Sequence, residues 1–295
     1  MKLRKVLCPT DFSAGSQQAL RVAARLANAS HAELVLAHSW HVPESAFTRF
    51  TFPGDLIQTL REDAEHGLAA AMRDARSYGV ERVTSTLVSG VAWHDMVEIA
   101  NRDEAVDLIV IGTHGRTGLR RVLMGSVAEK VIRHAPCSVL AVRPDSEPRP
   151  FLHALCPTDF SVSASHAVDL ASEIVPPDGA ITLVHVIEIP VPFSGEMPVA
   201  GLERELDRQA TEALQGSAAR LESRTKAKVT RQCRLGYPGA QTLAVLDGDP
   251  TIDIVIMGSQ GRTGIGRALL GSVAEKVTRH ARCPVLVARR RTSSP

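Results

Sequence analysis

Features expected of membrane or secreted proteins are missing from this chain. No apolar run approaches the roughly 18–20 residues that a membrane-spanning helix needs. The N-terminal stretch MKLRKVLCPTDF has neither the apolar region nor the cleavage site of a signal peptide. The five cysteines are an odd number, whereas secreted disulfide frameworks usually contain an even set. We therefore expect a cytoplasmic protein that has no membrane partner and whose thiols are free and mostly buried.

Aromatic residues make up only 4% of the chain and the formal net charge is +2, so no continuous basic surface with stacking aromatics is expected. This excludes nucleic acid as the expected partner. The sequence also shows no Ser-His-Asp or Cys-His nucleophile set and no CxxC or HExxH zinc motif. His38, His41 and His185 leave zinc binding open, but a strand-end histidine is more often a packed residue with one hydrogen bond.

What the chain does contain is an internal duplication. The segment LCPTDFS occurs at Leu7–Ser13 and again at Leu155–Ser161. A glycine-rich segment that starts at Gly112 recurs from Gly258, with roughly two-thirds of the aligned positions identical. Each half has about 145 residues, close to the commonest size of a single domain. A tandem duplication of one globular domain explains the pattern, because the period far exceeds the roughly 20–50 residues of solenoid repeats.

Both halves alternate between strand-like and helix-like patterns. In the first half, short apolar runs predict strands at Lys5–Cys8, Glu33–His38, Val83–Val88, Leu108–Gly112 and Ser138–Val142. Apolar residues spaced by three and four predict helices near Ser13–Asn28, Asp55–Tyr78, His94–Arg102 and Ser126–His134. The second half repeats this order, with strands near Leu152–Cys156, Ile181–Val186, Val229–Arg234, Ile252–Gly258 and Pro284–Ala288. The alternation predicts an α/β fold in which helices cover both faces of an open parallel sheet.

A joint between the two halves is indicated by the segment RPDSEPRP at Arg143–Pro150, which combines prolines with charges. We therefore predict one domain at residues 1–145 and a second at residues 151–290.

Candidate ligand positions fall where the predicted strands end. In an open parallel sheet, ligands bind beyond the carboxyl ends of the strands, at the point where the strand order reverses. Asp11, the Ser39 region and Gly112 follow the first, second and fourth predicted strands of the first half. Their counterparts in the second half are Asp159, the Val186 region and Gly258. We therefore expect one ligand-binding crevice in each domain.

The glycine-rich loops suit phosphate. Gly112 and Gly115 are expected to turn with positive φ and to let the backbone approach a ligand closely. Gly125 and Ser126 then begin a helix, whose free N–H groups and positive end favour phosphate oxygens. Gly258, Gly261, Gly271 and Ser272 repeat these positions. A purely structural role stays open for any one loop, because glycine turns and serine caps also serve only to start helices.

The spacing of these residues matches neither GxxxxGK[ST] nor GxGxxG. It resembles the G-x2-G-x9-G-[ST] motif of the ATP-binding branch of the universal stress protein family, at Gly112, Gly115, Gly125 and Ser126, and again in the second half. The resemblance extends to the PTD after the first strand, to LVLAHSW and ITLVHVIE, to VDLIVIGTHGRTG and IDIVIMGSQGRTG, and to CSVLAVR and CPVLVAR. Nearly the whole chain is covered, as a tandem two-domain member.

The resemblance implies two five-stranded domains of the adenine-nucleotide α-hydrolase-like, Rossmann-like kind, each with ATP extended across the strand ends. It implies that backbone at Ser39 and Val186 contacts adenine and that the loops hold ribose and phosphates. The implied nucleotide-binding residues are Pro9, Thr10, Asp11, Ser39, Gly112, Gly115, Arg116, Gly125, Ser126, Val127, Pro157, Thr158, Asp159, Val186, Gly258, Gly261, Arg262, Gly271, Ser272 and Val273.

Asp11 and Asp159 have two open roles. Each carboxylate can hold Mg²⁺ of a bound nucleotide through water. Alternatively, the aspartate or the serine that follows it can cap the next helix. The halves differ at Gln260 in place of His114 and at Gly266 in place of Arg120, so we expect unequal affinities in the two crevices.

Hydrolysis of ATP would need a positioned water, a base and a cation at the γ-phosphate, and the sequence offers only fragments of this set. Phosphates are within the reach expected of the loop arginines Arg116, Arg120, Arg121, Arg262 and Arg267, although an exposed loop arginine is more often solvated than ligating. We therefore expect a stress-response or signalling protein that binds ATP, with at most weak ATPase activity. A slow ATP hydrolase or adenylyl-transferring enzyme is the alternative, and a nucleotide-free interaction module is a third class.

Two further segments are candidates for interactions. The stretches Val42–Gly54 and Glu188–Gly201 differ most between the repeats, and we interpret them as lids or partner surfaces, with passive loops as the alternative. The resemblance implies that the two domains pair through their final strands as a pseudo-dimer, and Val139–Val142 and Val285–Ala288 are apolar enough for this. A homodimer of the tandem chain stays open, because no residue of the sequence decides it.

Overall fold

The computed structural model describes residues 3–40, 55–114, 124–146, 150–188, 199–261 and 270–291. The chain divides into two compact units, formed mainly by residues 2–148 and by residues 149–290. Within the described ranges, no helix has the combination of length and apolar character that a membrane span requires.

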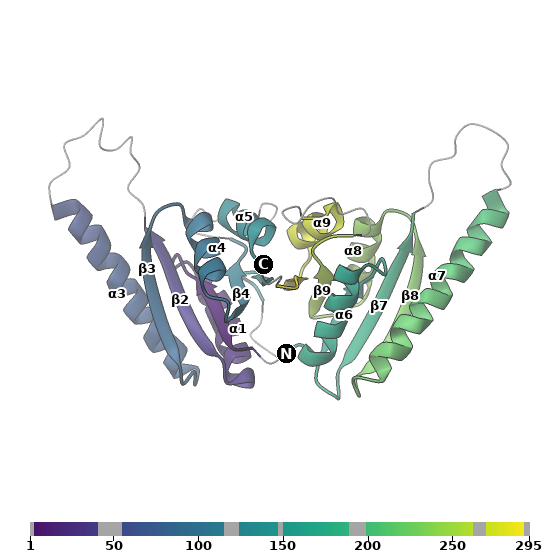
Figure 1. Cartoon of the computed structure of the whole chain (residues 1–295), viewed down its shortest axis with the longest axis horizontal. Helices are drawn as coiled ribbons and strands as arrows, with labels where there is room; N and C mark the ends of the chain where they lie inside the picture. Colours follow the sequence, from purple (N-terminus) through teal and green to yellow (C-terminus); the bar gives the residue numbers. More distant parts are fainter. Residues whose placement is uncertain are drawn as a thin grey trace. The chain divides into compact units, whose positions relative to one another are not determined.

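The first unit alternates strands and helices along the chain (Figure 1). Its strands are β1 (Lys5–Pro9), β2 (Glu33–Trp40), β3 (Val83–Ser89), β4 (Val106–Gly112) and β5 (Ser138–Val142). Its helices are α1 (Ala14–Ser30), α3 (Asp55–Ser77), α4 (Ala92–Arg102) and α5 (Ser126–His134). The strands pair in parallel in the order β3-β2-β1-β4-β5. The strand order therefore reverses between β1 and β4.

Helices cover both faces of this sheet. Helix α1 packs against β1 and β4, and α3 packs against β2 and β3 and touches α1. Helices α4 and α5 contact each other, with α4 on β2 and α5 on β5. Since right-handed crossovers that move in opposite directions along a sheet place their helices on opposite faces, α1 and α3 form one layer and α4 and α5 the other.

The second unit repeats this plan with strands β6 (His153–Pro157), β7 (Ala180–Ile187), β8 (Lys228–Leu235), β9 (Ile254–Gly258) and β10 (Val285–Ala288). Its helices are α6 (Val162–Ile174), α7 (Val199–Glu222), α8 (Pro238–Gly248) and α9 (Ser272–His280). All pairs are parallel, in the order β10-β9-β6-β7-β8. The predicted α/β fold, with a five-stranded open parallel sheet in each half, is confirmed.

The buried strands explain why this sequence folds in this way. Leu7, Leu36 and Ile109, on three neighbouring strands, are fully buried, as are Leu155 and Ile181 in the second unit. Burying each such side chain contributes about 1.5–3 kcal/mol. The continuous apolar runs of β1 and β4 are those expected of strands that are covered on both faces.

Element boundaries differ from the predictions by at most two residues. Strand β4 begins at Val106, two residues before the predicted start, because Val106 is fully buried and pairs with Lys5. Helix α4 begins at Ala92, after Val91, which has an extended backbone and makes no side-chain cap. Helix α5 spans Ser126–His134 as predicted.

Candidate functional site

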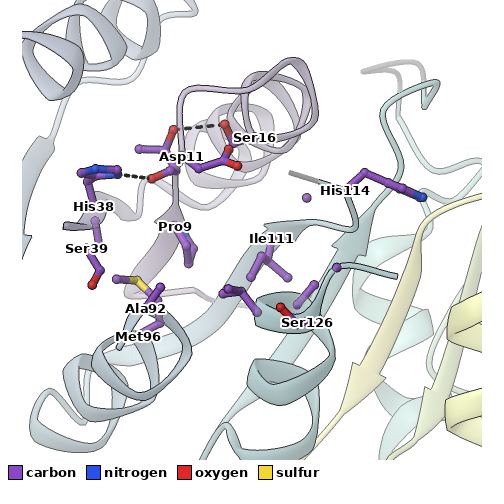
Figure 2. A pocket seen from close by; sticks show the side chains of 16 residues that line it. Pro9, Asp11, Ser16, His38, Ser39, Ala92, Met96, Ile111, His114 and Ser126 are labelled. Carbon is purple, nitrogen blue, oxygen red and sulfur yellow. Dashed lines mark hydrogen bonds between the residues drawn. The ribbon is translucent and has the colours of Figure 1, made fainter. Parts of the chain in front are cut away.

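A cavity of about 260 Å³ lies at the carboxyl ends of β1, β2 and β4 (Figure 2). This is the point at which the strand order of the first unit reverses, where ligands bind in open parallel sheets. The first turns of α1, α4 and α5 contribute the rest of its wall. Of the residues implied by the resemblance, those that line the cavity are Pro9, Thr10, Asp11, Ser39, Gly112, Gly125, Ser126 and Val127.

The turn after β1 is held in an unusual backbone conformation. Phe12 has a φ of 63°, in the left-handed region that costs an aromatic residue about 1–3 kcal/mol. Two local bonds fix it: Phe12 N donates to Thr10 Oγ1 at 3.0 Å, and Ser13 N donates to Asp11 Oδ1 at 3.1 Å. Phe160 repeats the conformation with a φ of 65°. Both turns therefore present the strand end in one fixed shape.

The side chain of Asp11 supports the start of α1. Its Oδ1 accepts from the Ser13 hydroxyl at 2.6 Å, and Ser13 Oγ is in turn the N-cap that accepts from Ser16 N at 3.3 Å. Asp159 Oδ1 accepts from Ser161 N at 3.0 Å in the same way. The serine two residues after each aspartate is therefore the helix cap, and the aspartate holds that serine in place. Binding of Mg²⁺ stays a prediction.

The strand-end histidines are packed residues. His38 Nδ1 lies 2.7 Å from the main-chain oxygen of Thr10, and its ring centroid lies 4.5 Å from that of Phe12. Because a carbonyl oxygen only accepts, the proton of the His38 ring is on Nδ1. His185 makes the same contact with Thr158 at 2.7 Å. No group of three or more potential ligands of a metal ion occurs in the described parts of the chain.

Helix α5 begins without a side-chain cap. Its N-cap is Gly125, which contributes no side-chain hydrogen bond, and Ser126 is the first helical residue rather than the cap. The first intrahelical bond is from Glu129 N to Gly125 O at 3.0 Å, so the N–H groups of Ser126, Val127 and Ala128 have no partner within the helix. All three residues line the cavity. Main-chain donors and the positive end of a helix dipole thus face the cavity, which suits a phosphate.

The glycine at the end of β4 has a different role from the predicted one. Positive φ was expected at Gly112, but among described glycines only Gly79 and Gly236 have it. A Cβ on Gly112 would lie 2.7 Å from the main-chain oxygen of Gly15 in α1. The prediction of positive φ was wrong, since what excludes a side chain at Gly112 is the approach of the helix to the strand end.

His114 lines the cavity, yet its ring does not face the other labelled side chains in Figure 2. Its Nδ1 lies 2.9 Å from the hydroxyl of Thr113. Burial lowers the pKa of His114 and the nearby Arg143 lowers it further, while Asp145 opposes the shift. A neutral ring turned away from the cavity makes His114 a weak candidate for a phosphate ligand.

The second unit brings the corresponding residues to the same edge of its own sheet. Pro157 ends β6, with Thr158 and Asp159 directly after it. Gly258 ends β9 and lies against the first turn of α6, since a Cβ there would come within 2.6 Å of Ser163 Oγ. A Cβ on Gly261 would meet Asp159 Oδ2 at 2.8 Å, so the loop after β9 touches the turn after β6. Neither Gly258 nor Gly261 has positive φ.

The start of α9 repeats that of α5. Gly271 is the N-cap, without a side-chain bond, and Ser272 and Val273 form the first turn. Gly271 N donates to Ser259 O at 2.8 Å, just as Gly125 N donates to Thr113 O at 2.7 Å. Val186 lies in β7 next to His185. In each half, therefore, the helix after the fourth strand begins without a side-chain cap beside the strand ends, as α4 and α8 also do.

Some predicted positions lie outside the described residues. They include the loop residues Gly115, Arg116, Arg120, Arg121, Arg262, Gly266 and Arg267, together with His41. The interpreted lid Val42–Gly54 also lies outside them, as do residues 189–198 of the second. Val199–Gly201 of the second segment belong to α7.

The sequence prediction missed one wall of the cavity. Ala92 and Met96 of α4 line it, and Asp95 lies behind them, with Oδ2 2.5 Å from Ser39 Oγ. A signal was present: a glycine follows the third strand in both halves, at Gly90 and Gly236. That glycine marks a third strand end at the same edge of the sheet.

Comparison with known proteins gives the family of both halves. Residues 2–143 and residues 150–289 each match the Universal stress protein family. The chain is 36% identical over 143 residues to universal stress protein MJ0531 of Methanocaldococcus jannaschii, covering 48% of this chain and 82% of that protein.

Two comparisons extend over nearly the whole length. A universal stress protein of Mycolicibacterium smegmatis is 26% identical, with 97% of each chain covered. The crystal structure of a universal stress protein from Archaeoglobus fulgidus shares the fold, with a TM-score of 0.68 at 20% identity over 99% of this chain and 100% of that one. The chain therefore belongs to the universal stress protein family, with two copies of the family's domain in tandem.

Proposed function

We propose that this protein binds ATP in one crevice per domain and that nucleotide binding controls a stress-response or signalling role. The observation that carries the proposal is the start of α5. The N–H groups of Ser126, Val127 and Ala128 lack partners within the helix and belong to residues of a cavity wall. The repetition of this start at Gly271 and Ser272 extends the proposal to the second domain.

The cavity fits a nucleotide in its chemistry. Phosphate-binding donors lie on one side, while Ala92 and Met96 offer apolar contacts to a base on the other (Figure 2). Its volume of about 260 Å³ is close to the lower end of the roughly 300–1,000 Å³ of small-molecule sites. The proposed ligands are those implied by the resemblance, including the loop residues Gly115, Arg116 and Arg262.

We include Mg²⁺ in the proposal, with Asp11 and Asp159 as the protein groups that would hold it. Mg²⁺ is usually bound by one or two carboxylates together with substrate phosphates and water, so a single aspartate per crevice fits the ion. When bound, it would neutralise phosphate charge. The aspartates themselves fix the turn after the first strand of each domain, which positions the strand end beside the nucleotide.

The rest of the expected organisation belongs to the same proposal. It comprises domains at 1–145 and 151–290, their pairing as a pseudo-dimer, a homodimer of the tandem chain, and a cytoplasmic location. Light scattering at several concentrations tests the homodimer, because a mass of twice 31.7 kDa is expected for it.

Equilibrium binding tests the function. Titration calorimetry with ATP and Mg²⁺ should find two sites per chain in the wild type and one in Gly261→Val, since a side chain at residue 261 would displace the Asp159 carboxylate. The equivalent Gly115→Val should remove the other site, and the double variant both. Gly216→Val is the matched control, because a Cβ at Gly216 in α7 meets nothing within 4 Å. Unchanged binding in the double variant would refute the proposed sites.

The same preparations address the enzymatic alternative. Release of phosphate or AMP well above the buffer rate, and lost in the double variant, would favour an ATP hydrolase or an adenylyl-transferring enzyme. Binding of two ATP molecules without product formation is the expected result.

A further inference from the structure

The cavity of the first domain contains a hydroxyl group whose hydrogen is already committed. Ser39, near the end of β2, donates to Asp95 Oδ2 at 2.5 Å, with Gly90 O as a second acceptor at 3.3 Å. An ionised carboxylate and a carbonyl oxygen can only accept hydrogen bonds. Whichever of them takes the hydroxyl hydrogen, Ser39 offers a ligand only its lone pairs.

Helix α4 and a glycine hold Asp95 in this position. Asp95 lies in the first turn of α4, where the helix dipole favours a negative charge. Its carboxylate lies over Gly90, where a Cβ atom would be 2.7 Å from Oδ1 and 2.9 Å from Oδ2. The absence of a side chain at residue 90 is therefore what lets the carboxylate reach Ser39.

Ser39 lies at the end of the cavity that suits a base. In Figure 2, Ser39, Ala92 and Met96 lie together, apart from Ser126 at the start of α5. Phosphates are drawn to the helix start by its N–H groups. A nucleotide with its phosphates at Ser126 therefore places its base beside Met96, whose side chain is apolar, and beside the Ser39 hydroxyl.

We propose that Ser39, oriented by Asp95, reads the edge of the base in the first crevice and selects a 6-aminopurine over a 6-oxopurine. The amino group of adenine donates to the Ser39 oxygen. The carbonyl oxygen of hypoxanthine would face the lone pairs of the Ser39 oxygen. It would lose its hydrogen bond to water and gain none in the crevice, which weakens binding. Asp95 acts as a positioning residue. The inference rests on the proposed nucleotide binding and extends it to base specificity.

The second domain lacks this pair. Val186 occupies the position of Ser39, and Gln241, five residues after Gly236, occupies that of Asp95. The Gln241 side chain lies over Gly236, with Nε2 3.1 Å from the position of a Cβ there. With no hydroxyl on residue 186, the second crevice is expected to discriminate less between the two bases.

Inosine triphosphate tests the inference, because its base differs from adenine only at the 6-position, where an oxygen replaces the amino group, and at N1, which then carries a hydrogen. The Ser39 variants report on the 6-position, since the N1 difference is the same in all of them. In a Gly261→Val background, which leaves the first crevice, ATP should bind at least about tenfold more tightly than inosine triphosphate. Ser39→Val should lower this ratio by about tenfold. Asp95→Asn should also lower it, with ATP affinity little changed, because the amide can turn its N–H group toward Ser39 Oγ, and the Ser39 hydrogen can then turn toward the carbonyl oxygen.

Two further variants complete the test. Ser39→Ala replaces Ser39→Val if the larger side chain disturbs β2. The Gly115→Val background leaves only the second crevice. There, Val186→Ser together with Gln241→Asp should raise the preference for ATP over inosine triphosphate. If the Ser39 and Asp95 variants still bind ATP and keep the wild-type ratio of ATP to inosine triphosphate affinity, base selection by Ser39 is overturned and the proposed ATP binding stands. If the Gly261→Val protein binds no ATP while circular dichroism shows it folded, the proposed function fails and the inference with it.

Discussion

The end of β4 and the first turn of α1 meet at two glycines: a Cβ on Gly112 would lie 2.7 Å from the main-chain oxygen of Gly15. A side chain on Gly15 would in turn collide with the main-chain oxygen of His114. The approach brings the helix start, the strand end and the turn after β1 around one cavity. Close packing of backbone thus shapes the candidate site.

Replacing Gly112 with alanine should destabilise the protein. The added methyl group meets backbone atoms that cannot rotate away, and such overpacking costs about 1–3 kcal/mol. Urea unfolding followed by circular dichroism measures the change. Gly216→Ala is the control, expected to be neutral or to stabilise α7 by up to about 1 kcal/mol. Equal stability of Gly112→Ala and wild type would contradict the packing described.

Two variants of Asp11 separate its support of the α1 cap from its proposed role in nucleotide binding. Asp11→Ala should cost about 1 kcal/mol of folding free energy, because Ser13 N and Ser13 Oγ lose their acceptor. Asp11→Asn keeps an acceptor oxygen and should fold with near wild-type stability, yet weaken the Mg²⁺-dependent part of ATP binding. Calorimetry with and without Mg²⁺ measures this. An asparagine variant that binds Mg²⁺-ATP as tightly as wild type would exclude a metal role.

Thiol labelling should modify one cysteine of the native protein. All five cysteines are free, and Cys233 is the only partly exposed one. Burial raises the pKa of Cys8 to about 12 and that of Cys283 to about 12, so neither forms thiolate near neutral pH. Burial, with Asp207 nearby, also raises the pKa of Cys233, so its labelling at pH 8 should be slow. Mass spectrometry should find one label on the native protein, none on native Cys233→Ser, and five on the denatured wild type. Rapid labelling of Cys8 in the native protein would contradict its burial.

The ion pair at the opposite end of the first sheet should give a pH-dependent stability. Lys5 Nζ lies 2.6 Å from Asp103 Oδ2, and this bond lowers the pKa of Asp103 and raises that of Lys5. Because the carboxyl of Asp103 is partly exposed, Asp103→Asn should cost only about 0.2–1 kcal/mol at pH 7.

The sign follows from the two shifts. Asp103 is more acidic in the folded than in the unfolded protein, so its contribution is present above the unfolded value of about 3.9 and is lost as the pH falls through the folded value. The Lys5 contribution is lost only in the alkaline range, as the pH rises through its raised folded pKa. Urea unfolding at several pH values should therefore show the Asp103→Asn difference at pH 7 and none near pH 2. A difference that persists at pH 2 would contradict the ion pair.

The fold followed from local patterns, and the candidate site followed only in part. Runs such as VLC of β1 and LIVI of β4 predict buried parallel strands, and the alternation of strands and helices predicts an open parallel sheet with helices on both faces. The order of the strands in the sheet came from the structure. The turn after β1 and the starts of α5 and α9 were also expected at the carboxyl edge of the sheet.

Contacts between distant residues could not be predicted. Ser39 and Asp95 are 56 positions apart, and the contact between Gly112 and Gly15 depends on how α1 packs on β4. A glycine at a strand end is compatible with a turn, a ligand or a helix approach, and only the tertiary structure distinguishes them. The same holds for Asp11, whose bonds to Ser13 accompany the positive φ of Phe12.

A crystal structure grown with excess ATP and Mg²⁺ tests the central claim most directly. The account predicts phosphate oxygens within hydrogen-bond distance of the main-chain N–H groups of Ser126 and Val127, and of Ser272 and Val273 in the second domain. It also predicts the adenine of the first crevice beside Ser39 and Met96. Both crevices without nucleotide, or phosphates bound away from the starts of α5 and α9, would contradict it.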